Sequence, residues 1–585
     1  MNIDKVGFTK SGGNKDTLYT AVFFVLFIFI TIVIFIKCSY GYTHFDEGFY
    51  PTIAARFLQG DRILVDEWNV TSLSGIVLMP VLKIFKLLNG DYTGIYLFIR
   101  YVYTALKVLL SLYIFHVFKK YDRKAAMVAA LLFLTFARYG LMVLSYNSVG
   151  SGTFLLSLII LFDEDIRKNR FKEILSKVLS GIILSVSVLC NPYFAGLYII
   201  YFVIAVLLEL RSVRRHLPKP AAPFNIGSFL NITIGVFISV VAFFTYVLSK
   251  SSPGQILNAL PYILNGDPEH RVKSFYYMTA GYFARILVGN DRNFISFAVY
   301  IVMFFVAMIY ILIKNKERFR RFYLISETVL SIILVFVYLI SDCVIDHIIF
   351  VPNVLALLLV IAVKDDLIKR IFICLYLPGM LATYFSYLAS NTGFSGISSS
   401  SCVAAVGSAF IITHVIRHLT EKESRSGRWL GFFLSFFLTI IFVSVLFLRI
   451  TNTFWEKGLD TLNTKIDFGP CKGLIVSENS FEYYNGVYED TKEIRELTSQ
   501  ENVIYISDMS LWMSGNHRCA AYSTWCMGIT YTDLLYDYYA DYPYKKAKYV
   551  YIDKEYGEKS ARYMAERLGM SIEEKKYGWI LKDTQ

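Results

Sequence analysis

The chain has 585 residues, of which 55% are hydrophobic and 17% aromatic, and it carries a net charge of +12 at a mean hydropathy of +0.49. Soluble domains are about 45–50% apolar, so this excess indicates a protein embedded in a bilayer. The basic residues stand in short clusters between apolar runs. That pattern is typical of loops that set membrane orientation, and it excludes nucleic acid as the expected partner.

Apolar runs long enough to cross a bilayer recur from Leu18 to Arg449. The first run, Leu18 to Ile36, is long for a signal peptide and is followed by no small-residue cleavage site, so we interpret it as a retained signal anchor. The sequence predicts a mostly α-helical, polytopic domain over residues 1–450 with about thirteen spans. They are 18–37, 94–118, 125–142, 148–162, 174–191, 194–210, 226–248, 294–313, 322–341, 346–363, 371–389, 400–418 and 429–449.

Six basic clusters lie between these runs, and two predicted spans separate each successive pair. Because cytoplasmic loops are rich in Lys and Arg, this spacing predicts that all six clusters and the N-terminus are cytoplasmic in a plasma-membrane protein. The run 70–88 contains a proline and two lysines, and counting it as a span would reverse every later cluster. We therefore predict that it lies in the outer interface. Two long loops, 38–93 and 249–293, then face outward.

The sharpest motif follows the first span directly and reads HFDEGFYP at 44–51. Asp46 and Glu47 stand within a few residues of the hydrocarbon, where a partly desolvated carboxylate suits a general base or a metal ligand. Apolar residues then recur at every fourth position from Phe49, which predicts a surface helix with both acids at its positive end. An ordinary acidic first turn of such a helix is the alternative interpretation.

Other polar groups of the outer loops are candidates for substrate contacts. Tyr50 follows the acidic pair, and Asp66 with Trp68 combines a carboxylate and an aromatic platform that suits a sugar ring. Anchoring in the interface explains Trp68 equally well. The second long loop is rich in cations, which suit a lipid-carrier phosphate but could also face solvent or anionic lipid. These cations are His270, Arg271, Lys273, Arg285 and Arg292.

Ionisable residues within the predicted spans are few. Arg100 either pairs with a polar neighbour or lies near the outer end of its span, and a functional role is the default hypothesis for such a residue. Lys107 and Glu209 are the main candidates for a transport pathway. Asp342 and His347 flank a short outer turn, where structural hydrogen bonds are the simplest interpretation.

The tail, residues 451–585, has a different character from the rest of the chain. Strand-like segments alternate there with helical patterns, which predicts a small extracytoplasmic α/β domain with a largely parallel sheet. The strands are predicted at 473–478, 502–507, 549–553 and 579–582, and the helices at 481–499, 530–540 and 556–569. The tail has no Gly-rich phosphate loop. Cys471, Cys519 and Cys526 would allow one disulfide, whose pairing the sequence leaves open.

The order of these elements resembles the bacterial glycosyltransferases of the GT-C superfamily, which include aminoarabinose transferases and protein O-mannosyltransferases. The resemblance rests on a signal anchor, then DEGFYPTIAARFLQGDRIL, an interfacial helix and the arginine-bearing span LFIRYVYTAL. It implies that Asp46 is catalytic with Glu47 beside it, and that transfer inverts the sugar. The family commonly has a second acid in the next outer loop, but this chain has SYNS at 145–148.

Asn147 and Tyr146 in that loop can hydrogen-bond a substrate but cannot act as carboxylates. Asn147 could instead cap the following span. We therefore expect no obligatory cofactor, although Asp46 and Glu47 could hold a divalent metal. The expected activity is transfer of a sugar from a polyprenyl-phosphate donor to a glycan, lipid or protein acceptor at the outer face. A polysaccharide polymerase or ligase, a lipid-sugar flippase and a non-enzymatic assembly factor are the alternatives.

Overall fold

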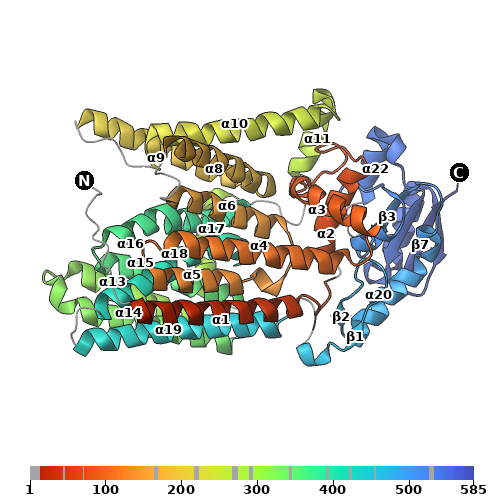
Figure 1. The fold of residues 1–585 in the computed structure, drawn as a ribbon. Helices are drawn as coiled ribbons and strands as arrows, with labels where there is room; N and C mark the ends of the chain where they lie inside the picture. Colours follow the sequence, from red (N-terminus) through yellow and green to blue (C-terminus); the bar gives the residue numbers. More distant parts are fainter. Residues whose placement is uncertain are drawn as a thin grey trace.

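A helical body and a C-terminal α/β domain at one end of it make up the protein (Figure 1). The computed structural model describes residues 13–43, 46–69, 71–163, 169–215, 223–265, 274–288, 294–341, 345–389, 394–420, 425–453, 456, 458–525 and 532–584. The helices of the first part of the chain are α1 Gly13–Lys37, α2 Asp46–Leu58, α3 Ser74–Asn89, α4 Ile95–Phe118, α5 Arg123–Thr135, η1 Arg138–Gly140, α6 Tyr146–Phe162, α8 Arg170–Cys190, α9 Phe194–Arg214 and α10 Ile226–Leu248. The later helices of the body are α11 Pro253–Asn265, α12 Phe275–Val288, α13 Phe294–Leu312, α14 Lys316–Ile340, α15 Ile345–Ala362, α16 Asp366–Ile371, η2 Phe372–Tyr376, α17 Leu377–Ala389, α18 Phe394–Thr420 and α19 Arg425–Thr451.

Eleven helical segments within the described residues are long and apolar enough to cross a membrane, and they coincide with eleven of the thirteen predicted spans. The other two predictions, 125–142 and 148–162, correspond to the shorter helices α5, with 13 residues, and α6, with 17. The chain is therefore a mostly helical, polytopic membrane protein. The helix α3 covers most of the run 70–88 and packs on α2; that it lies in the outer interface stays a prediction.

The chain between α5 and α6 departs from the predicted span, because α5 already ends at Thr135. Where a helix ends inside a membrane protein, the backbone carbonyls at and beyond its end have no intrahelical N–H partner and need other hydrogen-bond donors. Two cations from distant helices supply them: the Lys107 ammonium donates to the carbonyl of Phe136, and Arg449 Nη1 donates to the carbonyl of Gly140 at 2.9 Å. Lys107 thus has a structural partner in the break.

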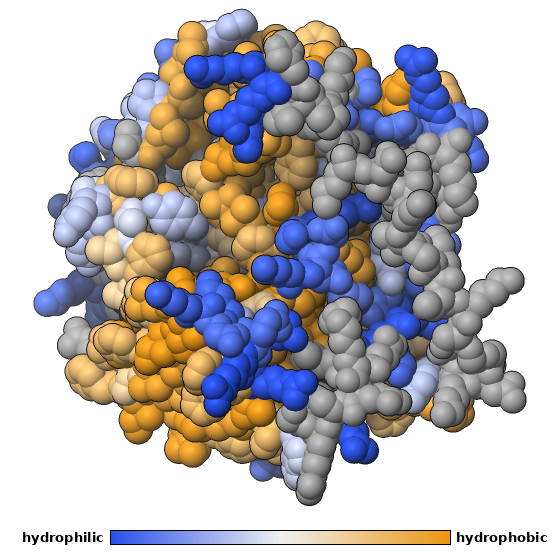
Figure 2. Space-filling model, turned by 90° about the vertical axis from the view of Figure 1, so that its left-hand side faces the viewer, coloured by the Kyte–Doolittle hydropathy of each residue, from blue (hydrophilic) through white to orange (hydrophobic). Residues whose placement is uncertain are grey.

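Polar contacts join the helix ends that lie away from the α/β domain. Lys120 pairs with Asp163 at 2.8 Å, and His414 Nδ1 lies 2.8 Å from a carboxylate oxygen of Asp122. The other ring nitrogen of His414 is 3.7 Å from Asp365. Three of the predicted basic clusters, 119–124, 364–370 and 417–428, contribute residues to these contacts or adjoin them. Figure 2 shows this end, where hydrophilic side chains gather in patches among apolar ones.

The α/β domain contains a five-stranded sheet in the order β4-β3-β5-β7-β6. Its elements are η3 Leu459–Thr461, β1 Thr464–Lys465, β2 Ile475–Val476, α20 Glu478–Asp490, α21 Lys492–Arg495, β3 Asn502–Ile506, η4 Met509–Ser514, β4 Arg518–Cys519, α22 Thr532–Asp541, η6 Pro543–Lys545, β5 Tyr549–Asp553, η7 Lys554–Tyr556, α23 Glu558–Leu568, β6 Met570–Glu574 and β7 Gly578–Asp583. Strand β3 pairs in parallel with β4 and β5, whereas β7 pairs antiparallel with β5 and β6.

The prediction of a largely parallel sheet is therefore wrong, because the last two strands form a hairpin. The first predicted strand, 473–478, also lies outside the main sheet. Its observed part, β2, pairs with β1, and Ile475 forms a bridge with Tyr40 just after α1. Cys471 and Cys519 are buried free thiols, and Cys526 lies outside the described residues.

A buried ionic network attaches the loop 38–93, which is predicted to be the first outer loop, to the α/β domain. Arg56, near the end of α2, is fully buried and donates to Glu67, to Thr524 Oγ1 at 3.0 Å and to Asp61 at 2.8 Å. Its remaining donors meet two backbone carbonyls, one from the loop and one from the domain. Burial raises the pKa of Glu67, against the opposite pull of Arg56. The guanidinium thus supplies the counter-charge of the fully buried Glu67 and of Asp61, whose side chain is 8% exposed.

Three further contacts extend the junction. Lys545 of the domain pairs with Asp61, and Tyr544 donates to Asp66 at 3.0 Å. Burial alone would raise the pKa of Asp66, but hydrogen bonds from Arg62 hold it below its usual range. Trp68 stacks on Tyr262 of α11, with ring centroids 4.2 Å apart. The loop 38–93, the start of the second outer loop and the domain therefore pack as one unit (Figure 1).

Substitution of Arg56 by methionine should destabilise this junction by about 3–5 kcal/mol, because it leaves the fully buried Glu67 without its counter-charge, while Asp61 keeps its pair with Lys545. Thermal unfolding and limited proteolysis of the purified protein would measure the loss. Arg562→Met is the matched control, since Arg562 pairs with Glu558 on the surface with both side chains more than half exposed. Equal melting temperatures for the two variants would contradict the assigned role of Arg56.

Candidate active site

The start of α2 is held to α4 by a buried ion pair. Glu47 is 1% exposed, and its two carboxylate oxygens accept from Arg100 Nε and Nη2, each at 2.6 Å. Arg100 also donates to the carbonyls of Cys38 and Gly41, which lie directly after the end of α1. Arg100 thus pairs with a polar neighbour, and it lies in the second turn of its span, at the end that adjoins the α/β domain; that this end faces outward stays a prediction. The fork-like geometry orients the first turn of α2.

Asp46 is the first residue of α2 and is half-buried. One turn later, the buried Tyr50 meets Tyr146 edge-to-face, with ring centroids 5.8 Å apart. Burial raises the pKa of Tyr50; Tyr146 and Asp46 act in the same direction, and Arg138 opposes them. Asp46, Arg138 and Tyr146, from α2, η1 and α6, therefore each lie within electrostatic reach of Tyr50, on the side of the helical body that carries the α/β domain.

The first turn of α6 is tied to its neighbours. Ser145 caps this helix and forms a capping box with Ser148, so the alternative that Asn147 caps it is wrong. Asn147 is buried, 6% exposed. The side chain of Asn191 donates to the carbonyl of Tyr146 at 2.8 Å, which links the start of α6 to the end of α8. Tyr146, predicted from the SYNS segment, is thus brought beside Tyr50 on a fixed turn, and Asn147 is the next residue of that turn.

The other predicted site residues do not lie in the cluster around Asp46 or lie outside the described residues. Asp66 and Trp68 lie in the junction with the α/β domain, where intramolecular partners surround them, and we infer a structural role for both. Arg285 is half-buried on α12. Four of the predicted phosphate-binding residues lie outside the described residues: His270, Arg271, Lys273 and Arg292. Asp342 also lies outside them, while His347 is buried beside the ring of Tyr338.

Arg138 is the residue of this cluster that the sequence interpretation missed. Arg138 falls within the predicted span 125–142, and the apolar residues around it make the whole run resemble a membrane helix. A charged residue at such a position is itself a signal of function. The early end of α5 places it on η1, within electrostatic reach of Tyr50, rather than in a membrane-spanning helix.

A second missed residue is Glu327, which lies within α14 and is fully buried. Neither carboxylate oxygen has a hydrogen-bond partner among the described residues. It belongs to a different part of the bundle from the cluster around Asp46, and its hydroxyl neighbours Thr328 and Ser331 bond back to their own helix.

Metal binding at the acidic pair has little support from geometry. Both oxygens of Glu47 already accept from Arg100, so a cation there would have to displace a guanidinium. Among the residues described, no group of three or more His, Cys, Asp or Glu side chains is arranged to hold a metal.

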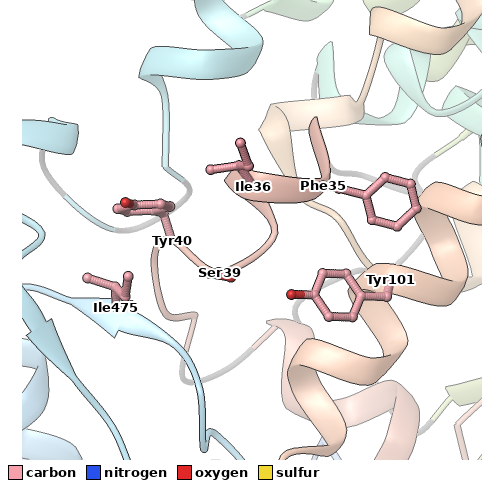
Figure 3. Close-up of a pocket in the computed structure, with 6 residues that line it drawn as sticks. All are labelled: Phe35, Ile36, Ser39, Tyr40, Tyr101 and Ile475. Carbon is pink, nitrogen blue, oxygen red and sulfur yellow. The ribbon is translucent and has the colours of Figure 1, made fainter. Parts of the chain in front are cut away.

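An open crevice of about 630 Å³ lies where the outer ends of α1 and α4 meet β2 (Figure 3). It is lined by Phe35, Ile36, Ser39, Tyr40, Tyr101 and Ile475. These side chains carry no charge, and Tyr40 and Tyr101 give the rim two hydroxyl-bearing rings. Apolar walls with tyrosines at the boundary between span and outer domain suit contact with lipid at the headgroup level.

Comparisons with known proteins find distant structural likeness only. No protein-family model matches the sequence, and no curated protein matches it at a significant level. The chain is similar to the archaeal oligosaccharyltransferase AglB from Archaeoglobus fulgidus, in complex with an inhibitory peptide and a dolichol-phosphate, with 12% identity and a TM-score of 0.48 over 94% of this chain and 71% of that one. It is also similar to ArnT from Cupriavidus metallidurans bound to undecaprenyl phosphate, with 12% identity and a TM-score of 0.43 over 97% of this chain and 98% of that one. Values at this level assign no activity, so the proposal below rests on the residues of this chain.

Replacing Glu47 by glutamine should cost about 3–5 kcal/mol of stability, because Arg100 would be left as a buried, uncompensated charge. Asp46→Asn should change the melting temperature little, since Asp46 is only half-buried. Thermal unfolding of the two variants in the same detergent checks this, with the exposed Glu482→Gln as the control. A stable Glu47→Gln protein would show that the ion pair does not fix α2.

Proposed function

We propose that this chain is a membrane glycosyltransferase that moves a sugar from a polyprenyl-phosphate donor to an acceptor at the outer membrane face. The observation that carries the proposal is the position of Asp46, half-buried at the start of a helix fixed at both ends, one turn before Tyr50, on which Asp46, Arg138 and Tyr146 all act electrostatically. A carboxylate and a guanidinium at the outward end of a membrane bundle supply what such a transfer needs: a base for a hydroxyl and a cation for a phosphate.

In this proposal Asp46 accepts the proton of the acceptor hydroxyl as its oxygen attacks the anomeric carbon of the sugar. The bond from that carbon to the carrier phosphate breaks, and the electron pair leaves with the phosphate. A single displacement of this kind inverts the anomeric centre. The phosphate is a good leaving group, so no second carboxyl is required to protonate it.

Arg138 binds the carrier phosphate, since its guanidinium matches phosphate geometry and it lies beside the site at the membrane boundary. The cations of the second outer loop, Arg271 foremost, complete the phosphate site. Tyr50, Tyr146 and Asn147 contact the sugar or the acceptor. Glu47 acts through its ion pair with Arg100 by positioning Asp46, and the reaction uses no obligatory cofactor. The acceptor is a glycan, a lipid or a protein.

A lipid-sugar flippase is the second candidate, and Glu327 is the observation that favours it. A fully buried carboxyl in a span, with no hydrogen-bond partner among the described residues, is a functional hypothesis by default. A flippase would move the donor across the membrane without breaking the sugar–phosphate bond, and it would not depend on Asp46.

The proposed orientation puts the N-terminus and the basic end of the bundle in the cytoplasm, and the α/β domain outside. Single cysteines at Lys119 and at Lys472 in a cysteine-free variant should label only from the cytoplasmic and only from the outer side, respectively, with a membrane-impermeant maleimide. Labelling of Lys119→Cys from outside would reverse the orientation and remove the proposed compartment of the reaction.

Asp46→Asn should lower kcat by about 10²–10⁴-fold while leaving donor binding unchanged, because the amide keeps the shape but accepts no proton. Arg138→Gln should instead raise KM for the donor. Transfer from a purified polyprenyl-phosphate sugar to acceptor, in reconstituted vesicles, measures both values, and the exposed Asp460→Asn serves as the matched control.

Two results would contradict the assignment. If Asp46→Asn retained normal turnover, Asp46 would not be the base. If the donor appeared intact on the opposite face of wild-type vesicles without any transfer, the flippase would replace the transferase.

A further inference from the structure

His517 is a buried histidine of the α/β domain, in the short turn between η4 and β4. It is 1% exposed, and neither of its ring nitrogens has a hydrogen-bond partner among the described residues. The ring lies against the backbone of Gly515, since a Cβ on that glycine would come within 1.8 Å of Nε2. Asn516 and Arg518, its neighbours in the chain, are exposed. The ring is therefore packed without polar contacts close to the surface, where burial favours its neutral form.

The charge beside His517 opposes a proton on the ring. Arg495, at the end of α21, is the one group among the described residues that acts on His517 electrostatically. Its guanidinium is held in place, because it lies 3.4 Å from the ring centroid of Tyr488 and Nη2 donates to the carbonyl of Tyr488 at 2.8 Å. Tyr505 of β3 lies within electrostatic reach of the same guanidinium, and burial keeps its hydroxyl uncharged by raising its pKa. Burial, together with Arg495, lowers the pKa of His517 to about 4.

The carboxylates on the elements around this turn have partners of their own. They are Glu493, which pairs with Lys575 and Lys582; Glu496, which pairs with Lys492; Glu501, which pairs with Lys548; and Asp508, which accepts from Tyr42. A proton on His517 would thus add a second positive charge beside Arg495, and no acid of the described residues acts on the ring to neutralise it.

The turn that contains His517 joins two stretches of chain that hold α2. One stretch is η4, and the other follows β4; together they make up segment 509–525. Its contacts with α2 are Phe49 stacked on Trp525 with ring centroids 3.7 Å apart, Thr52 Oγ1 at 3.3 Å from the carbonyl oxygen of Met509, and Arg56 Nη2 at 2.7 Å from that of Ala521. They run from the first turn of α2 to its last, so a change in this segment reaches the whole helix.

Few directional contacts of side chains fix η4 itself. Trp512 Nε1 and Ser514 Oγ are buried, and neither has a hydrogen-bond partner among the described residues. Packing therefore holds this stretch in place. A segment held in this way opens more easily than one with a hydrogen-bonded ladder, and a charge within it has few bonds to break.

We propose that His517 makes the attachment of α2 to the α/β domain sensitive to acid: protonation of the buried ring loosens segment 509–525, and the domain then releases α2. Because the pKa of the ring is lower in the packed segment than its usual 6.5, the contacts are fully stable above pH 6.5. They weaken as the pH falls from 6.5 toward 4, since the loosened segment takes up the proton first. The device is independent of the reaction proposed for Asp46.

Hydrogen exchange of the full chain in detergent, followed by mass spectrometry of its peptides at about pH 8 and about pH 5, tests the proposal. The protection factor, which is the ratio of intrinsic to observed exchange rate, removes the direct effect of pH on exchange. In wild type it should fall roughly 30-fold in peptides from segment 509–525 and from α2, and stay unchanged in the β6–β7 hairpin. His517→Leu, which is neutral at both pH values, should lose less than about threefold in the same peptides.

His116→Leu is the matched control, because His116 is exposed on α4 and its loss should leave the wild-type response intact. A local readout is needed, since His414 at the far end of the bundle pairs with Asp122 and Asp365 and would add its own titration to a melting curve of the whole chain.

Equal losses of protection in wild type and in His517→Leu would overturn the role of His517, as would unchanged protection in wild type. A loss in wild type that extends equally to the β6–β7 hairpin would indicate unfolding of the whole domain and overturn the release of α2. If His517→Leu does not fold, His517→Gln is also neutral at both pH values and carries the same expectation.

Discussion

Arg56 lies fully buried between the first outer loop and the α/β domain, and it donates to three side chains and two backbone carbonyls. Its charged partners, Asp61 and Glu67, belong to the same loop, whereas Thr524, the Ala521 carbonyl and the pair of Lys545 with Asp61 make the connection to the domain. Separating the two parts would leave Lys545 without its partner and two donors of a buried guanidinium unsatisfied. At its other end, α2 is tied to α4 by Glu47 and Arg100. Asp46 therefore stands on a short helix that is fixed at both ends, which is how a lone carboxylate can be held in one place at a membrane boundary.

The spans could be predicted from the sequence because hydrocarbon thickness and loop charge act on short stretches of chain. The early end of α5 could not, since the donors that stabilise it, Lys107 and Arg449, come from other helices. The sheet was predicted only in outline. Strand β4 has two residues, and β6 lies at the sheet edge with a largely polar sequence, so neither gives the alternation of a strand. Whether two strands pair in parallel or antiparallel depends on tertiary packing, so no local sequence pattern predicts it.

For the candidate site, the local motif predicted Asp46, and the SYNS segment predicted Tyr146, which the fold brings to Tyr50. The motif could not reveal that Glu47 is bound by Arg100, because the two residues are 53 positions apart. It also could not separate a sugar platform from a packing residue at Trp68, since both need the same aromatic surface. Long-range contacts place Asp66 and Trp68 in the junction with the α/β domain and Tyr146 beside Tyr50, and no local pattern predicts either arrangement.

The junction also sets an order of events during synthesis. Arg56 and Thr524 are 468 residues apart, and Lys545 follows its partner Asp61 by 484 residues. At a translation rate of about 5–20 residues per second, Lys545 therefore follows Asp61 by roughly 25–100 s. During that interval Glu47 and Arg100 can already pair and fix the start of α2, whereas its other end still lacks the contacts with the domain. A ribosome that stalls before Ala521 leaves a chain in which α2 is held at one end only.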